Sequence, residues 1–199
     1  MRRVANELGA GTMTLYHYVR NKEDLLALVD DAIMGEVLVP EGEMPDSWRD
    51  ALREIAQRSR EVFRRHPWRA VNLGEAHGGP NSVRHFDQSL AAVESTGLSE
   101  RDRLEIIAMV DDYVLGNSVR QTEVELPAEE WTSVIADYLG DMLETGEFKH
   151  VEKLVAGDSP EEAVQRVMAV MRDQSAFDRG LERLLDGIEL FVKSKKKKP

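Results

Sequence analysis

Residues 2–22, with the sequence RRVANELGAGTMTLYHYVRNK, are the most informative segment of this chain. Apolar residues share one face of a first short helix, predicted over residues 2–8. Gly9 can take the left-handed conformation that ends a helix, and Thr12 can cap a second helix running to about Tyr18. Two short helices joined by a tight turn are typical of the helix-turn-helix, whose second helix lies in the major groove of DNA.

The second helix carries side chains suited to contacting DNA. Leu15 and Val19 are four residues apart and are expected to face inward. The remaining side chains offer hydroxyl groups and methyl groups for base edges, and polar tips or a cation for phosphate oxygens. We therefore predict DNA contacts from Thr12, Met13, Thr14, Tyr16, His17, Tyr18 and Lys22. The alternative for Tyr16 and Tyr18 is that they only pack this small domain against the following helix.

This segment resembles the helix-turn-helix of the TetR family of one-component transcriptional regulators. The matching residues are Leu8-Gly9, the run TLYHYV at 14–19 and the run NKEDLL at 21–26. The resemblance implies an all-helical homodimer that represses a promoter and lets go when a small molecule binds its C-terminal domain. It also implies DNA contacts from Arg2, Thr12, Met13, Thr14, Tyr16, His17 and Lys22.

The sequence departs from the family at its start. Family members normally have another helix before this point, whereas Met1 stands at the beginning of the second family helix. Without the earlier helix, the inward faces of Val4, Leu8, Leu15 and Val19 have less to pack on. We expect that the real start lies upstream. The alternative is a truncated chain, a helical small-molecule-binding dimer that has lost DNA binding.

Composition narrows the function classes. The chain has 199 residues, no cysteine and a formal net charge of −11, yet residues 1–22 carry four basic side chains against one acidic one. An acidic body with a basic N-terminus is expected to repel DNA everywhere except at that end. A lysine-rich tail at 194–199 is expected to be disordered.

Several kinds of site are absent from the sequence. It contains no run of 18 apolar residues and no apolar signal core, so we expect a cytoplasmic protein that does not contact membranes. The spacing of His66, His77, His85 and His150 does not suit a metal, and neither a metal nor a cofactor is expected. No catalytic motif is present, so we do not expect an enzyme.

Helical spacing of apolar residues continues along the rest of the chain, without an alternating strand pattern. We predict helices over 22–37, 47–65, 82–95, 99–125, 127–142, 148–155, 160–172 and 177–192, with a short helix opening at Trp68. The prolines and glycine of 39–47 mark a boundary. The predicted organisation is all-α: a helix-turn-helix domain with its connecting helix over 1–38, an effector-binding and dimerisation domain over 46–193, and the tail over 194–199.

Two helices are candidates for pairing with a second copy. The segments around 104–120 and 179–192 are apolar on more than one face, and Gly116, Gly180 and Gly187 permit close helix approach. The resemblance implies that they form a four-helix bundle in a homodimer, which suits a palindromic operator in double-stranded DNA. The alternative is that both are core helices of one chain.

The effector pocket is expected to be largely apolar, with a few polar groups, for a small molecule of similar character. Side chains that can line it are Trp68, Phe86, Met109, Asp112, Tyr113, Asn117, Trp131, Tyr138 and Phe148. Polar anchors can come from His85, Asp112, Asn117 or Gln121. For each aromatic residue the alternative is core packing. Asp112, in the middle of an apolar helix, must be exposed, paired or facing a polar cavity.

Overall fold

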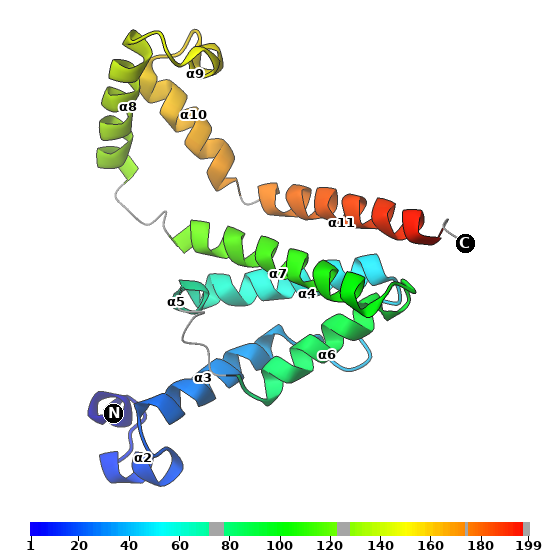
Figure 1. The fold of residues 1–199 in the computed structure, drawn as a ribbon. Coiled ribbons are helices and arrows are strands. Elements are labelled where there is room, and N and C mark those ends of the chain that lie inside the picture. Colours follow the sequence, from blue (N-terminus) through cyan, green and yellow to red (C-terminus); the bar gives the residue numbers. More distant parts are fainter. Residues whose placement is uncertain (72–77, 123–127, 174, 197–199) are drawn as a thin grey trace. The chain divides into compact units, whose positions relative to one another are not determined.

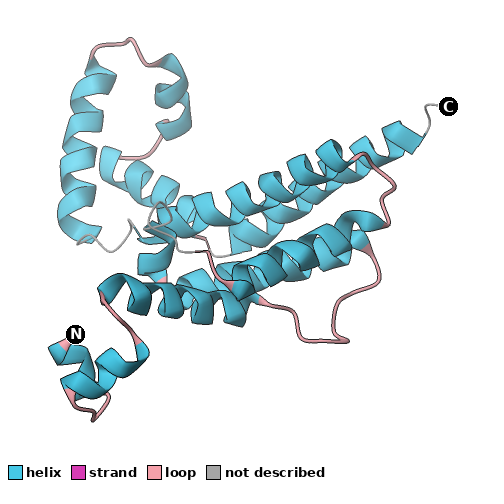
Figure 2. Ribbon diagram, turned by 60° about the horizontal axis from the view of Figure 1, so that its bottom comes forward, coloured by secondary structure: helices cyan, strands magenta, loops and turns pink. Residues whose placement is uncertain are grey.

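The computed structural model describes residues 1–71, 78–122, 128–173 and 175–196, and no strand occurs among them. In chain order the helices are α1 Arg2–Glu7, α2 Thr12–Tyr18, α3 Lys22–Val37, α4 Trp48–Arg65, α5 Pro67–Val71, α6 Pro80–Glu94, α7 Glu100–Thr122, α8 Ala128–Glu144, α9 Lys149–Val155, α10 Pro160–Arg172 and α11 Ser175–Lys196 (Figure 1). Figure 2 shows helices joined by loops throughout. The all-α prediction is confirmed.

Side-chain caps set several of the helix starts. Asn21 accepts a hydrogen bond from the Asp24 N–H at 2.7 Å at the start of α3, and Ser47 caps α4 in the same way. The predicted pairing of Ser99 with Asp102 opens α7, where the Asp102 N–H donates to Ser99 Oγ at 3.2 Å. These helices therefore begin where the capping residues predict.

Other boundaries differ from the prediction. Thr12 is the first residue of α2 rather than its cap, because Gly11 takes the extended cap conformation. Prolines open two helices earlier than predicted, α5 at Pro67 and α6 at Pro80, since proline has a suitable φ and needs no donor at the first helical position. The predicted end of a helix at 125 and the predicted start of another at Pro127 lie outside the described residues.

The chain divides into two compact units. The first comprises 1–118 and 188–199, and the second comprises 119–187. In the first unit α3, α4 and α6 pack on one another, and Ile33, Val37 and Val62 form a buried cluster at the α3–α4 contact. In the second unit α8 packs on α10. The sequence-defined domains have other limits and stay a prediction.

Long apolar stretches do not occur in the helices. Within the described ranges, no helix is long and apolar enough to cross a membrane.

The lysines at 195 and 196 belong to the last turn of α11, whereas the sequence suggested a disordered tail from 194 onward. The helix continues there because lysine is a good helix former and its charge is favourable near a helix C-terminus.

Candidate DNA interface and effector region

The N-terminal head, residues 1–22, has a small core of its own. Ala5, Leu15 and Val19 are buried together, and Met1 and Leu25 pack against them. Gly9 ends α1 with a φ of 64°, the left-handed conformation that the sequence suggested. Burial of Leu15 and Val19 fixes which side of α2 faces outward, as predicted from their spacing.

Two apolar side chains of α1 do not join this core. Val4 is 37% exposed and Leu8 is 66% exposed, although both were expected to face inward. Ala5 supplies the contact instead, because α1 is only six residues long and the described residues cover only one narrow face of it. The head therefore carries an exposed apolar patch on α1, made of Val4 and Leu8.

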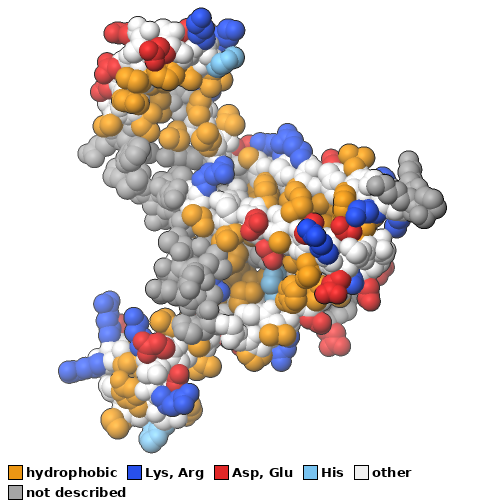
Figure 3. Space-filling model, viewed as in Figure 1, with side chains coloured by type: hydrophobic (Ala, Val, Ile, Leu, Met, Phe, Trp, Pro, Cys, Tyr) orange, Lys and Arg blue, Asp and Glu red, His pale blue; other side chains and the backbone are white. Residues whose placement is uncertain are grey.

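The candidate DNA contacts lie on the open side of the head. All but one are exposed, with values of 74% for Met13 and 81% for Tyr18, and Thr12 is half-buried. The exposed members are Arg2, Met13, Thr14, Tyr16, His17, Tyr18 and Lys22. Exposure of Tyr18 does not fit the alternative in which it packs on the following helix. Figure 3 shows Lys and Arg side chains gathered around this end of the chain.

Arg20 is a further candidate contact, which was not predicted from the sequence. Its backbone N–H and its Nε both donate to Asp24 Oδ2, at 3.1 and 2.9 Å, and these bonds lower the pKa of the Asp24 carboxyl. The Arg20 side chain remains 90% exposed. Its position directly before a helix N-terminus was the available signal, since helix starts of this kind lie near phosphates. We add Arg20 to the candidate contacts.

A buried polar link joins α3 to the helices that follow. Asp30 of α3 and Arg69 of α5 form an ion pair with 3.0 Å between Oδ1 and Nε, and both side chains are less than a tenth exposed. Beside it, Asp31 Oδ1 accepts from the Asn81 N–H at 2.7 Å, and Asn81 Nδ2 donates to the Asp31 carbonyl at 2.9 Å. A Cβ atom on Gly79 would collide with the Asp31 carboxylate. The start of α6 is thus fitted closely to α3.

Further polar contacts hold the C-terminal half of α3. Glu36 pairs with Arg65 at 2.8 Å and with His66 at 3.2 Å, both at the end of α4. The Val39 N–H donates to Gln88 of α6 at 3.1 Å. Through these contacts, the helix that carries the head is tied to α4, α5 and α6 within the first unit.

The predicted pocket residues divide between the two units. Trp68, Phe86 and Met109 of the first unit are 42 to 47% exposed, Tyr113 and Asn117 are half-buried, and Asp112 is exposed. Tyr138 and Phe148 lie in the second unit and are also exposed, and the side chain of Trp131 lies outside the described part. Of the three outcomes left open for Asp112, the structure shows exposure. The structure does not gather these residues into one described pocket.

Three polar atoms on successive helices are buried without a hydrogen-bond partner in the described structure. They are Arg69 Nη1 on α5, His85 Nδ1 on α6 and Asn117 Oδ1 on α7. Burial lowers the pKa of the His85 imidazole and so favours its neutral form. Arg103 Nε, near the start of α7, is another such atom. Of these residues, His85 and Asn117 were predicted from the sequence as polar anchors, whereas Arg69 was not.

The adjacent carboxylates of α7 also have an unusual environment. Although the Asp111 side chain is exposed as a whole, burial of its carboxyl and repulsion from Asp112 raise its pKa to about 6. A carboxyl of this kind gains or loses its proton near neutral pH.

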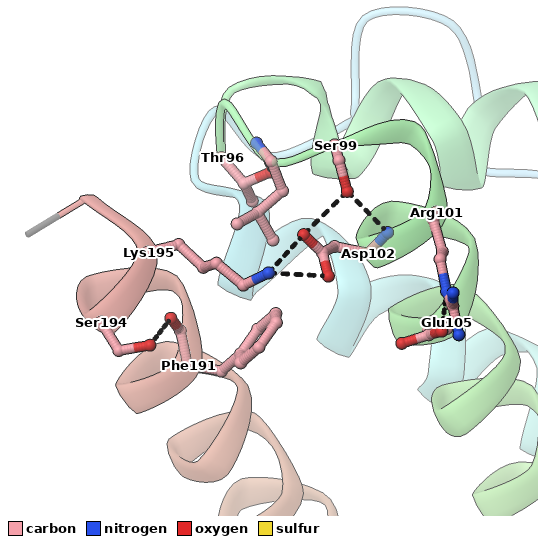
Figure 4. Close-up of polar contacts among 9 residues, drawn as sticks. Thr96, Ser99, Arg101, Asp102, Glu105, Phe191, Ser194 and Lys195 are labelled. Carbon is pink, nitrogen blue, oxygen red and sulfur yellow. Dashed lines mark hydrogen bonds and ion pairs between the residues drawn. The ribbon is translucent and has the colours of Figure 1, made fainter. Parts of the chain in front are cut away.

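A separate pocket of about 380 Å³ lies beside the α6–α7 turn and the end of α11, all within the first unit. Lys195 Nζ lies 3.0 Å from Asp102 Oδ2 and 5.0 Å from the centre of the Phe191 ring, and Ser99 donates to Asp102 at 2.8 Å (Figure 4). Hydrogen bonds from Lys195 and Ser99 lower the pKa of Asp102. Asp102 and Lys195 of its lining already pair with each other, so this ion pair joins the end of α11 to the start of α7.

Comparison with known proteins identifies the class to which these features belong. The model of the tetracyclin repressor-like C-terminal domain matches residues 40–192. The HTH-type transcriptional repressor DrrR1 of Streptomyces coeruleorubidus is 33% identical over 201 residues, which cover 96% of this chain and 70% of that protein. An HTH-type transcriptional regulator of Saccharopolyspora erythraea is 36% identical over 118 residues, and the match spans half of its length.

Solved structures agree with the sequence comparisons. The TetR family protein ActR of Streptomyces coelicolor, in its complex with actinorhodin, matches with a TM-score of 0.67 and 25% identity over 96% of this chain and 87% of that one. The chain therefore belongs to the TetR family of transcriptional regulators.

Proposed function

We propose that this protein is a transcriptional repressor that binds a palindromic operator as a homodimer and is released by a small-molecule effector. The observation that carries the proposal is the N-terminal head, in which α2 buries Leu15 and exposes the candidate DNA contacts. The names of the related repressors and the actinorhodin complex of ActR support it. Such a role places the protein in the cytoplasm and needs no catalysis.

Dimerisation through α7 and α11 is part of this proposal. Leu104 and Met109 of α7 and Leu190 of α11 are 38, 47 and 70% exposed, while other apolar residues of the same helices are buried. A Cβ atom on Gly116 or Gly187 would meet no atom within 4 Å, so both positions leave room for another helix. In each of these two helices, one face packs in the core and another face is exposed for contact with a partner. Two heads would then lie on successive turns of DNA.

Release would follow from a shift between two states of the dimer. An effector that prefers a state with wrongly spaced heads draws the protein off the operator. A preference of about 100-fold corresponds to about 2.7 kcal/mol per site, which is enough when both sites of the dimer are filled. The polar contacts that tie α3 to α4, α5 and α6 give such a shift a physical route to the head.

The test is fluorescence anisotropy of the chain with DNA from the intergenic region upstream of its gene, at low and near-physiological salt. Tyr16→Phe and Lys22→Ala should weaken binding about equally on all sequences, and Lys22→Ala should reduce the salt dependence. Thr14→Ala should change the preferred sequence. Lys153→Ala, an exposed lysine of α9, is the control and should change neither. Selective binding that none of the head variants alters would show that the head is not the DNA interface.

The second candidate function is a small-molecule-binding dimer without DNA binding. The exposed Val4 and Leu8 favour it, because a head with an incomplete core is marginally stable. The same titration separates the two functions: effector binding without selective DNA binding at either salt concentration would establish the second.

A further inference from the structure

The unpartnered atoms of α5, α6 and α7 form a complementary set. Arg69 Nη1 can only donate a hydrogen bond, and Asn117 Oδ1 can only accept one. His85 Nδ1 can do either, because the neutral imidazole has two tautomers. Proteins rarely leave buried polar atoms without partners, and a bound ligand is one way of supplying them. All three belong to the first compact unit.

Aromatic side chains neighbour two of these atoms along their helices. Phe86 follows His85 on α6, and Tyr113 precedes Asn117 by about one turn on α7. Hydrophobic side chains are exposed on this face of the first unit (Figure 3). A ligand here would bury mainly apolar surface.

Charge selects against an anionic ligand. The Arg69 guanidinium already pairs with Asp30 at 3.0 Å, so its charge is compensated. Asp111 and Asp112 on α7 and the overall charge of −11 further disfavour an anion. A neutral acceptor such as a carbonyl oxygen can still take the free Nη1 hydrogen atoms without adding charge.

We propose that the effector is a neutral, mostly apolar ring compound whose carbonyl accepts from Arg69 Nη1 and whose hydroxyl donates to Asn117 Oδ1, with His85 as a third polar partner. The proposal rests on the proposed function only in calling this compound the effector. Because Arg69 also pairs with Asp30 of α3, the ligand contacts a residue that is bonded directly to the helix carrying the head.

The hydroxyl contact is tested with two fluorescent probes, 6-acetyl-2-naphthol and 2-acetylnaphthalene, which differ only in the hydroxyl group. The wild-type chain should bind the hydroxylated probe about tenfold more tightly, since the hydroxyl satisfies a buried acceptor. Asn117→Leu should abolish that tenfold difference. Ser118→Ala should preserve it, because the Ser118 hydroxyl already donates to the Val114 carbonyl at 2.8 Å.

The carbonyl contact is tested in the same way, with 6-acetyl-2-naphthol against 2-naphthol. The acetyl group should raise the affinity about tenfold in the wild-type chain. It should not raise the affinity in the double variant Asp30→Asn/Arg69→Met, which leaves no buried charge unpaired. Absence of probe binding to the wild-type chain, or a hydroxyl preference that survives in Asn117→Leu, would overturn the proposal.

Operator release separates this proposal from the function on which it rests. Probes that bind as expected but leave the DNA bound would confirm the ligand class and contradict its role as effector. A chain that releases DNA for a different compound, and does not bind the naphthols, would retain the repressor function and refute the ligand class.

Discussion

Replacing only one partner of the buried ion pair between Asp30 and Arg69 should destabilise the chain more than replacing both. At 3.0 Å, the two charges attract with about 5 kcal/mol at an effective dielectric constant of 20, and desolvation offsets most of this gain. Arg69→Met leaves a carboxylate buried without its cation. We expect this variant to lose about 3 kcal/mol of unfolding free energy, and Asp30→Asn to lose about 2 kcal/mol. The double variant should lose only about 1 kcal/mol, less than either single change.

Urea unfolding followed by far-ultraviolet circular dichroism measures these free energies, and a surface pair supplies the control. Arg101 and Glu105 of α7 pair at 2.8 Å with side chains 87 and 57% exposed, so Glu105→Gln should cost less than about 0.5 kcal/mol. Single changes at Asp30 and Arg69 that cost no more than this control, or whose costs add up in the double variant, would contradict the prediction.

Three further outcomes follow from the structure. Asp111→Asn should stabilise the chain at pH 7.5 by about 1 kcal/mol, discounted for exposure, and have almost no effect at pH 3, since a raised folded pKa costs stability as the pH rises from about 4 to 6; thermal unfolding at both pH values checks the sign. Gly9→Ala should destabilise the head by about 1 kcal/mol because the φ of Gly9 is 64°, and this loss should appear as a lower DNA affinity. Ala10→Gly is the control and should lower the affinity less. Ser159→Ala should cost about 1 kcal/mol, because Ser159 and Glu162 form a capping box, and unchanged urea unfolding would contradict it.

Local signals predicted the helices well, because caps and apolar spacing act over a few residues. The start of α3 at Lys22 and the cap of α4 at Ser47 were both predictable from such signals. Thr12 was assigned wrongly as a cap because glycine and threonine compete for that position, and Gly11 can adopt the extended conformation without strain.

Contacts between distant residues were not predictable from one sequence. The pairing of Asp30 with Arg69 joins residues 39 positions apart, and the only local signal was an acid inside an apolar stripe. Val4 and Ala5 are adjacent on a short helix, and which of them is buried depends on neighbours that periodicity does not specify. The assignments of pocket and DNA-contact residues remain predictions, since exposure alone does not identify a ligand.

The first compact unit is discontinuous, because it begins with the N-terminal head and is completed by residues 188–199. Ile188 and Val192 are buried, and Arg49 of α4 bonds Glu189 of α11 at 3.4 Å. A ribosome must therefore finish α11 before the body that supports the head can close. Nascent or prematurely ended chains would carry the helix-turn-helix on a support that has not yet folded, with its apolar surface exposed.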